Sequence, residues 1–195
     1  IVGRIDSFFY NPFFKTLQKT IESKKYAELG ELVEFSKETW DQKSIFDDQF
    51  PYIEISNIDT TIGEIAKTDF VPVAEAPSRA KMVVRNGDII VSTTRPNRGA
   101  ITPIAKEQDG FIASTGFAIL RDMKNSKVLK DYLFVALRTS LSLRQMEQRM
   151  TGGNYPAITT EDLRKIKIVI PEMKTQEKIV VGVKSIYEKT KRLRQ

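Results

Sequence analysis

The chain has 195 residues, of which 41% are hydrophobic and 29% charged, and this composition is ordinary for a globular protein with one substantial core. It contains neither cysteine nor histidine, which excludes a disulfide framework, a thiolate metal site and every catalytic scheme that needs an imidazole. The net charge is +6, and the segment 174–195, with seven basic and two acidic residues, carries +5 of it.

The N-terminal part, residues 1–25, is predicted to be a helical lead-in. The chain begins with Ile1 rather than an initiator methionine, and we expect it to be an excerpt of a longer sequence. Asn11 has the side chain of a helix N-cap, and Pro12 suits the first helical position. The face expected to be buried consists of Phe13, Phe14, Leu17 and Ile21.

The middle part, residues 26–172, is predicted to be a strand-rich body. Residues 29–35 alternate partly between apolar and polar, and residues 52–56 do so more regularly, which is typical of strands. Asn86-Gly87-Asp88 is a strong turn signal between two apolar runs. The strands on either side of the turn and after it are expected at 81–84, 89–91, 100–105, 111–114 and 117–120.

Helical spacing returns toward the end of this body. An apolar stripe predicts one helix over about 128–148, and the glycines and proline of 151–156 end it. A short helix over 158–164 and a last strand over 165–170 follow. We therefore predict a mixed α/β fold, in which a strand-rich domain with a few helices is followed by a C-terminal helix of the coiled-coil type.

The C-terminal part, residues 173–195, is predicted to be a basic helix. Its apolar positions are spaced four and three residues apart, which forms a heptad seam. The seam consists of Ile179, Val183, Ile186, Thr190 and Leu193. So short a seam indicates either a partner helix or packing of this face on the core of the same domain. The lysines of the helix either form a solvated face or contact phosphates.

Two short motifs are typical of enzymes, and in both a helix start is the favoured interpretation. Asn11-Pro12-Phe13-Phe14 resembles the loop with which adenine methyltransferases hold a flipped base, but Phe13 replaces a second proline and no glycine-rich cofactor loop precedes it. Glu172-Met173-Lys174 has the spacing of metal-dependent nucleases, but it follows a proline at a strand-to-helix junction. We therefore predict no catalytic residue and no metal ligand in this chain.

Two loops contain the residue types that contact nucleic acids. Segment 92–99 follows a buried strand, and its arginines have the fork geometry that pairs with guanine, while asparagine suits adenine. Segment 152–156 combines backbone N–H groups beside glycines with an aromatic ring. An ordinary hairpin loop and a helix C-cap are the alternative interpretations. The candidate DNA contacts are Ser92, Thr94, Arg95, Asn97, Arg98, Gly153, Asn154 and Tyr155, with Arg79 and Lys81 as candidate phosphate contacts.

The order and spacing of these motifs together resemble one half of a type I restriction-modification specificity subunit. The resemblance is carried by Arg4 to Pro12, Gly87 to Ser92 with Arg95-Pro96 and Gly99, Ser114 to Phe117, Asp131 to Leu133, Gly152 to Ile158, Asp162-Leu163, Ile168 to Pro171 and Gln176 to Val180. The same domain occurs fused to adenine methyltransferases, so the C-terminal portion of a single-chain restriction enzyme is an alternative. A coiled-coil protein-interaction module is another.

The resemblance implies a non-catalytic target-recognition domain that binds double-stranded DNA and directs a methyltransferase and a nuclease to a half-site. Its implied partners are the modification and restriction subunits, and a second recognition domain or a homodimer partner bound through the C-terminal helix. Ile179, Val183, Ile186 and Leu193 would then form that interface. S-adenosylmethionine, Mg²⁺ and ATP are expected only in partner subunits, and this chain is expected to hold no cofactor. We expect a cytoplasmic protein with no membrane partner.

Overall fold

The computed structural model describes residues 7–41 and 46–194, so the first residues of the predicted lead-in, Arg4 to Asp6 among them, lie outside the described residues. Contacts divide the chain into two compact units. Unit 1 contains the described residues up to Leu32, the short segment Arg95–Asn97 and everything from Met123 on, and unit 2 contains those of Val33–Thr94 and Arg98–Asp122. The predicted lead-in and the predicted tail helix thus belong to the same unit.

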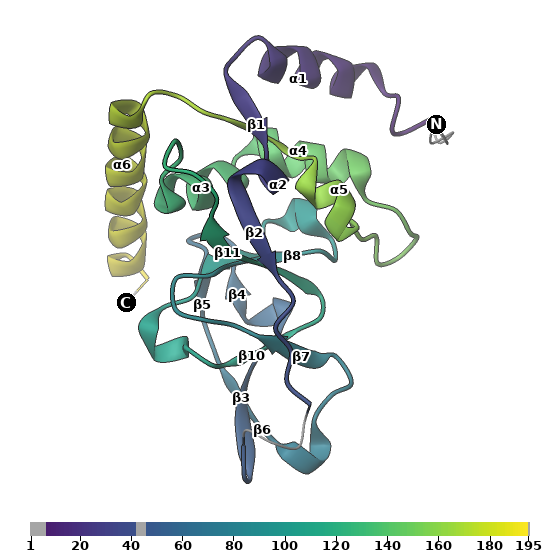
Figure 1. Cartoon of the computed structure of the whole chain (residues 1–195), viewed down its shortest axis with the longest axis vertical. Helices are drawn as coiled ribbons and strands as arrows, with labels where there is room; N and C mark the ends of the chain where they lie inside the picture. Colours follow the sequence, from purple (N-terminus) through teal and green to yellow (C-terminus); the bar gives the residue numbers. More distant parts are fainter. Residues whose placement is uncertain (1–6, 42–45, 195) are drawn as a thin grey trace. The chain divides into compact units, whose positions relative to one another are not determined.

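Unit 2 is rich in strands (Figure 1). Its strands are β2 Val33–Ser36, β3 Gln49–Ile53, β4 Ile58–Asp59, β5 Glu64–Ile65, β6 Asp69–Pro72, β7 Ala80–Val83, β8 Ile89–Ser92, β9 Ile101–Pro103, β10 Ile112–Ser114 and β11 Phe117–Met123. One four-stranded sheet has the order β6-β3-β10-β7, in which β10 runs parallel to β3 and antiparallel to β7. A second has the order β2-β11-β8-β9, and β4 pairs with β5 as a small hairpin. Short 3₁₀ turns follow at η1 Ile55–Asn57, η2 Val73–Glu75 and η4 Lys106–Gln108, while η3 Pro96–Arg98 begins in the unit 1 segment and ends in unit 2.

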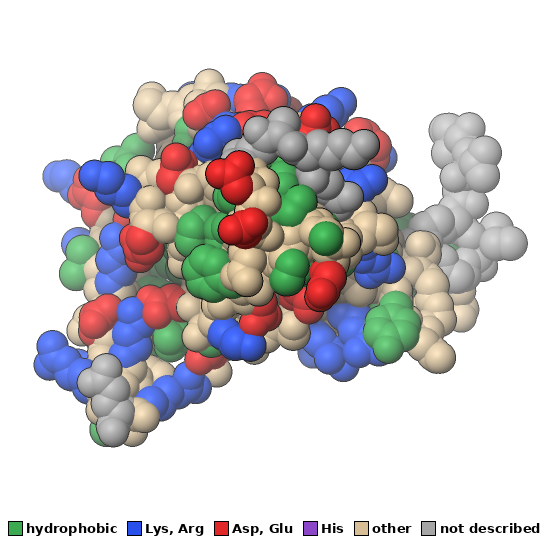
Figure 2. Space-filling view, turned by 90° about the horizontal axis from the view of Figure 1, so that it is seen from below, with side chains coloured by type: hydrophobic (Ala, Val, Ile, Leu, Met, Phe, Trp, Pro, Cys, Tyr) green, Lys and Arg blue, Asp and Glu red, His purple; other side chains and the backbone are tan. Residues whose placement is uncertain are grey.

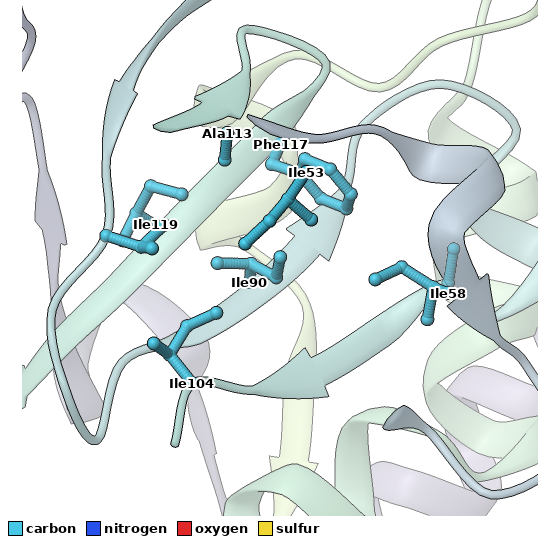
Figure 3. Close-up of a cluster of buried hydrophobic side chains, with 9 residues drawn as sticks. Ile53, Ile58, Ile90, Ile104, Ala113, Phe117 and Ile119 are labelled. Atoms are coloured by element: carbon cyan, nitrogen blue, oxygen red, sulfur yellow. The ribbon is translucent and has the colours of Figure 1, made fainter. Parts of the chain in front are cut away.

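Neighbouring residues of the first sheet supply two different apolar clusters, because successive side chains of a strand point to opposite faces. In Figure 3 side chains from both sheets point toward one another in the first cluster, which contains Ile53, Ile58, Val84, Ile90, Ala100, Ile104, Ala113, Phe117 and Ile119. The second cluster contains Trp40, Phe50, Tyr52, Ala80, Val83 and Ile112. Each large side chain that is fully buried in this way stabilises the fold by about 1.5–3 kcal/mol.

A buried ion pair fixes the predicted turn between β7 and β8. Gly87 has a φ of +83°, a conformation that favours glycine. Asp88 is buried and accepts hydrogen bonds from the Arg85 backbone N–H at 2.8 Å and from Arg121 Nε at 3.1 Å. Glu38 forms ion pairs with both arginines, and the hydrogen bond from Arg85 is the main cause that lowers the pKa of its carboxyl. The turn is therefore tied to β11 by charge as well as by strand pairing.

Unit 1 is mainly helical. Its elements are α1 Pro12–Glu22, β1 Tyr26–Glu28, α2 Leu29–Leu32, α3 Lys130–Leu137, α4 Ser140–Arg149, α5 Thr160–Arg164, β12 Lys167–Val169 and α6 Met173–Arg192. Strands β1 and β12 pair antiparallel, while α1 packs on α4, α2 on α5 and α3 on α6. The Asn11 side chain accepts a hydrogen bond from the Phe13 N–H at 2.9 Å, so the predicted N-cap of α1 is confirmed. Among the described residues, the helices lack the combination of length and hydropathy that a bilayer-spanning segment has.

One buried glutamine anchors the N-terminal end of α6. The Gln176 side chain is 0% exposed, donates to the carbonyls of Lys127 at 2.8 Å and Pro171 at 3.0 Å, and accepts from the Leu129 N–H at 2.9 Å. Val180, one turn further on, is also buried. Beyond it, Lys184 forms a 2.6 Å ion pair with Asp131 of α3, and Arg138 Nε donates a hydrogen bond to the Tyr187 hydroxyl at 3.3 Å.

The mixed α/β class is confirmed, but several predicted elements differ from the observed ones. Phe13 is 54% exposed, and Phe14 and Ile21 form the buried face of α1, so the prediction for Phe13 is wrong. The predicted strand over 29–35 is a helical turn, α2, followed by β2. The strand expected at 52–56 ends at Ile53, and the 3₁₀ turn η1 begins two residues later, at Ile55.

The helix predicted over 128–148 is two helices, α3 and α4, separated at Arg138-Thr139. The hydroxyls of Thr139 and Ser142 both donate to the Ala136 carbonyl, at 2.7 and 2.8 Å. Hydroxyl groups that bond to nearby carbonyls in this way compete with the backbone N–H groups that continue a helix. The apolar stripe continues across the break, and for this reason periodicity alone does not reveal it.

Candidate nucleic-acid interface

The first residues of the predicted reading loop are held by hydrogen bonds within unit 2. Ser92 is 1% exposed, and its hydroxyl donates to the Thr94 carbonyl at 2.7 Å. Thr93 donates to the Gly116 carbonyl from both its backbone N–H, at 2.8 Å, and its hydroxyl, at 2.9 Å. Ser92 therefore shapes the loop from inside, whereas the half-buried Thr94 lies nearer to solvent.

The predicted loops 92–99 and 152–156 meet at Arg95, within unit 1. The Arg95 backbone N–H donates to the Pro156 carbonyl at 2.7 Å, and a guanidinium N–H donates to the Asn154 carbonyl at 2.5 Å. The guanidinium carbon lies 4.5 Å from the centroid of the Tyr155 ring, which is the geometry of a cation–π contact. Tyr155 is 73% exposed, so the pair presents an aromatic face and a positive charge to solvent.

The backbone of Arg95 is strained in this position. Its φ is +48°, and it is the non-glycine residue for which the described structure records a positive φ. A side chain in this region of φ costs about 1–2 kcal/mol relative to a right-handed conformation. Strain of this kind persists only where surrounding contacts impose it, and it is frequent at functional sites.

The 152–156 loop is closed at its base by a β-bridge. Thr151 and Ala157 exchange two backbone hydrogen bonds, each of 2.8 Å. Gly152 has a φ of +109°, which requires glycine. Gly153 and Asn154 are exposed, and a Cβ at Gly153 would meet no atom within 4 Å. A ligand can therefore approach the backbone at Gly153 closely.

Asn97 and Arg98, the two remaining candidate residues of the first loop, differ in whether their side chains already have hydrogen-bond partners. The Asn97 amide donates to Glu147 Oε1 at 3.3 Å within unit 1 and is half-buried. Arg98, in unit 2, is exposed, and its guanidinium has no hydrogen bond or ion pair to any residue that the structure describes. Of the two loop arginines, Arg98 is thus the one whose guanidinium is not engaged by another described residue.

Arg79 borders a surface hollow that the sequence did not reveal. This hollow of about 330 Å³, called the Arg79 hollow below, lies in unit 2 and is lined by Tyr52, Glu54, Ile55, Ser56, Pro77, Ser78, Arg79 and Ser114. Its walls come from three segments far apart in the sequence, so no local motif could indicate it. Lys81, the other candidate phosphate contact, is exposed on β7 and does not line the hollow.

Charge is mixed over the face of the molecule that Figure 2 shows. Acidic and apolar side chains gather in the middle of this face, and basic side chains lie around them without forming one continuous surface. Among the described residues, no group of three or more Asp and Glu side chains is placed to hold a metal ion. The described residues on this face therefore form no broad basic surface that would attract phosphates.

The predicted seam of α6 is only partly covered within unit 1. Gln176 and Val180 form the buried face, whereas Ile186 is 60% and Leu193 89% exposed. Ile179 and Val183 are half-buried at the border between the two faces. The helix thus packs on its own unit with a face next to the seam, and an apolar strip of the seam stays at the surface.

The sequence has known relatives. A family model for the type I restriction modification DNA specificity domain matches residues 21–195. The specificity subunit of the type I restriction enzyme HindI from Haemophilus influenzae is 27% identical over 138 residues, which cover 70% of this chain and 27% of that subunit.

Solved structures of type I restriction-modification proteins are also similar to this chain. The HsdS subunit from Thermoanaerobacter tengcongensis matches with a TM-score of 0.73 and 33% identity, over 87% of this chain and 43% of that one. A second chain with the same TM-score, identity and coverage comes from work on the complex assembly and conformational transition of the type I R-M system. The present chain therefore spans about a quarter of the length of the first relative and less than half of the other two.

Proposed function

The chain belongs to the family of type I restriction-modification DNA specificity domains, and on this premise we propose that it reads one half of a split recognition site in double-stranded DNA. The main supporting observation is the Arg95–Tyr155 pair, in which a strained arginine stacks on a ring that is 73% exposed. The ring buries little surface within the described part of unit 1, so it adds little to the stability of that unit. An exposed aromatic ring beside a guanidinium offers a base a surface to stack on and a phosphate a positive charge.

Each loop residue has a separate role in this proposal. Arg98 reads a base, since its guanidinium is unoccupied and arginine matches guanine O6 and N7 with two hydrogen bonds. Thr94, Gly153 and Asn154 contact phosphates through hydroxyl, backbone and amide groups. Asn97 contributes only if DNA displaces Glu147 from its amide. Ser92 is left out of the contact set, because it is buried and bonded to Thr94.

The chemistry of modification and cleavage belongs to other subunits in this proposal. Ile179, Val183, Ile186 and Leu193 bind a helix of a second recognition domain, or of a second copy of this chain, with Ile186 and Leu193 as the exposed apolar contacts. The modification and restriction subunits dock on the assembled unit and supply S-adenosylmethionine, Mg²⁺ and ATP sites, while this chain holds no cofactor. The complex acts on cytoplasmic DNA. The basic side chains of α6 add attraction that depends on salt and not on sequence.

The proposal is tested by selecting bound duplexes from a randomised pool and measuring affinities at one fixed salt concentration. The wild-type chain should select a defined half-site. Arg98→Ala should lose about 1–3 kcal/mol of discrimination at one base pair, and Arg98→Lys should lose it too, because lysine keeps the charge but not the fork.

Two other outcomes would contradict parts of this assignment. If Arg98→Ala weakened binding to all sequences equally, Arg98 would contact a phosphate and not a base. If the wild-type chain retained no duplex even at low salt, DNA binding itself would be refuted for this chain, and an interaction module acting through α6 would be the better function. Lys189→Ala serves as a control, because it should weaken all sequences equally and flatten the dependence on salt.

A further inference from the structure

The Arg79 hollow has the form of a small recognition pocket. Its volume of about 330 Å³ lies at the lower end of the roughly 300–1,000 Å³ found for small-ligand sites. Its walls are the end of β3 with the residues that follow it, the segment before β7 and the last residue of β10. All of them belong to unit 2, so the hollow is defined by one compact unit.

The hollow has buried hydroxyl groups in its wall. Tyr52 is 3% and Ser114 6% exposed, and their side chains are hydrogen-bonded to each other. Burial raises the pKa of the Tyr52 phenol above its usual value, so this wall stays uncharged at neutral pH. The hydroxyls are thus fixed polar groups and not sources of charge.

Two exposed side chains of opposite charge also line it. The Arg79 guanidinium has no hydrogen bond or ion pair to any residue within the described part of the chain. The Glu54 carboxylate is exposed and accepts a long hydrogen bond, of 3.4 Å, from the Ser56 hydroxyl. An isolated arginine would suit a phosphate, but a carboxylate lining the same hollow repels one.

Backbone hydrogen bonds connect the hollow to the start of the reading loop. The Arg79 carbonyl accepts from the Thr115 N–H at 2.8 Å, and the next residue, Gly116, accepts from Thr93. A Cβ at Gly116 would lie 2.9 Å from Cδ1 of Ile55, which lines the hollow. Glycine at this position therefore leaves Ile55 where it is and keeps the hollow open beside residues 92–94.

We propose that the Arg79 hollow reads one G·C base pair of the recognised half-site, with Arg79 donating to guanine O6 and N7 and Glu54 accepting from the N4 amino group of cytosine. The inference rests on the proposed function and extends it from the loops to this hollow. A G·C pair presents two acceptors on guanine and one donor on cytosine at its major-groove edge. A guanidinium and a carboxylate in one hollow complement that edge. A phosphate has no donor for the carboxylate, and an A·T pair has no single base with two acceptors for the guanidinium fork, because the adenine N6 donor separates adenine N7 from thymine O4.

The experiment is selection of duplexes by the whole 195-residue chain, with wild type, Arg79→Gln and Glu54→Gln compared in parallel. Wild type should select a half-site with an invariant G·C pair. Each variant should relax the preference at that same pair, by about 5- to 150-fold, and leave the other positions unchanged. Both side chains are exposed, so thermal melting should be unaltered, and Lys106→Gln, another exposed residue of unit 2, should retain the full preference.

The outcomes separate this inference from the proposed function. A wild-type chain with no preferred sequence would refute both. A wild-type chain with a defined half-site that Arg79→Gln leaves intact, or weakens uniformly, would refute the reading of a base pair by the hollow and leave the loop assignment standing. Variants that relax two different positions would also overturn it, because the proposal requires that Arg79 and Glu54 read one base pair.

Discussion

Replacing Arg95 by glycine and by alanine separates its functional contacts from the strain that it bears. Both changes remove the guanidinium from Tyr155 and from the Asn154 carbonyl. Only glycine also relieves the φ of +48°. At most exposed positions glycine is the more destabilising of the two, so the structure predicts a reversal of the usual order.

The magnitudes follow from the contacts. An exposed cation–π contact contributes about 0.5–1 kcal/mol and a hydrogen bond about 0.5–1.5 kcal/mol, so Arg95→Ala should lower the free energy of unfolding by about 1–2.5 kcal/mol. Arg95→Gly loses the same contacts, but it removes about 1–2 kcal/mol of strain. The greater freedom of glycine in the unfolded chain offsets about 0.5–1 kcal/mol of that gain. The glycine variant should therefore be more stable than the alanine variant by about 0.5–1 kcal/mol.

The assay is urea denaturation followed by far-ultraviolet circular dichroism, with DNA affinity measured on the same samples. Both variants should bind the half-site equally weakly, because both lack the guanidinium. If alanine were as stable as glycine or more so, the backbone at Arg95 would not be strained, and the physical argument for a functional site there would fail. If either variant bound DNA like wild type, the pair of Arg95 and Tyr155 would have no part in recognition.

Two further predictions concern stability. Gln176→Ala should lower the free energy of unfolding by about 2–4 kcal/mol, because it leaves one N–H and two carbonyls without their partner in a buried site. As a control, Glu177→Gln at the exposed neighbouring position should change this free energy by less than about 0.5 kcal/mol. Equal denaturation midpoints for the two variants would contradict the anchoring role of Gln176. Hydrogen bonds from cationic side chains, Arg85 on Glu38 and Lys167 on Glu22, lower the pKa values of these carboxyls in the folded state, so the unfolded chain binds protons first. The two ion pairs should contribute fully to the stability of the fold above the ordinary carboxyl pKa of 4.5, and this contribution should be lost as the pH falls through the lowered pKa values. Urea midpoints measured over this pH range should therefore fall less steeply for Glu38→Gln than for wild type. An unchanged pH profile in the variant would refute the stabilising role of the Glu38 ion pairs.

The sequence predicted those elements whose cause is local. The turn at Gly87 follows from a glycine with positive φ between two apolar runs, and the start of α1 follows from an asparagine whose side chain caps the next turn. The break between α3 and α4 also has a local cause, the hydroxyls of Thr139 and Ser142, but the apolar stripe that crosses it is the stronger pattern. Helix α2 is a single turn, too short for any periodicity to identify.

The candidate site was predictable in composition but not in arrangement. Residue types nominated the loops around Arg95 and Tyr155 separately, yet the contact that joins them spans 59 positions in the sequence. Ser92 has a suitable side chain for a DNA contact, but burial at the end of β8 commits it to the loop itself. The Arg79 hollow arises where three strand ends converge, and sequence spacing has no information about such convergence.

The segment Arg95–Asn97 sets a condition on how pieces of such chains can be exchanged. It belongs by its contacts to unit 1, although residues on both sides of it belong to unit 2. A recombination that replaces residues 33–122 therefore brings in a new residue at position 95 but keeps the old Asn154 and Pro156. The incoming residue must tolerate a left-handed backbone and still offer its N–H to Pro156. Chimeras that also carry residues 151–157 keep both sides of this contact from one parent, and they are the exchanges that can transmit a sequence preference intact.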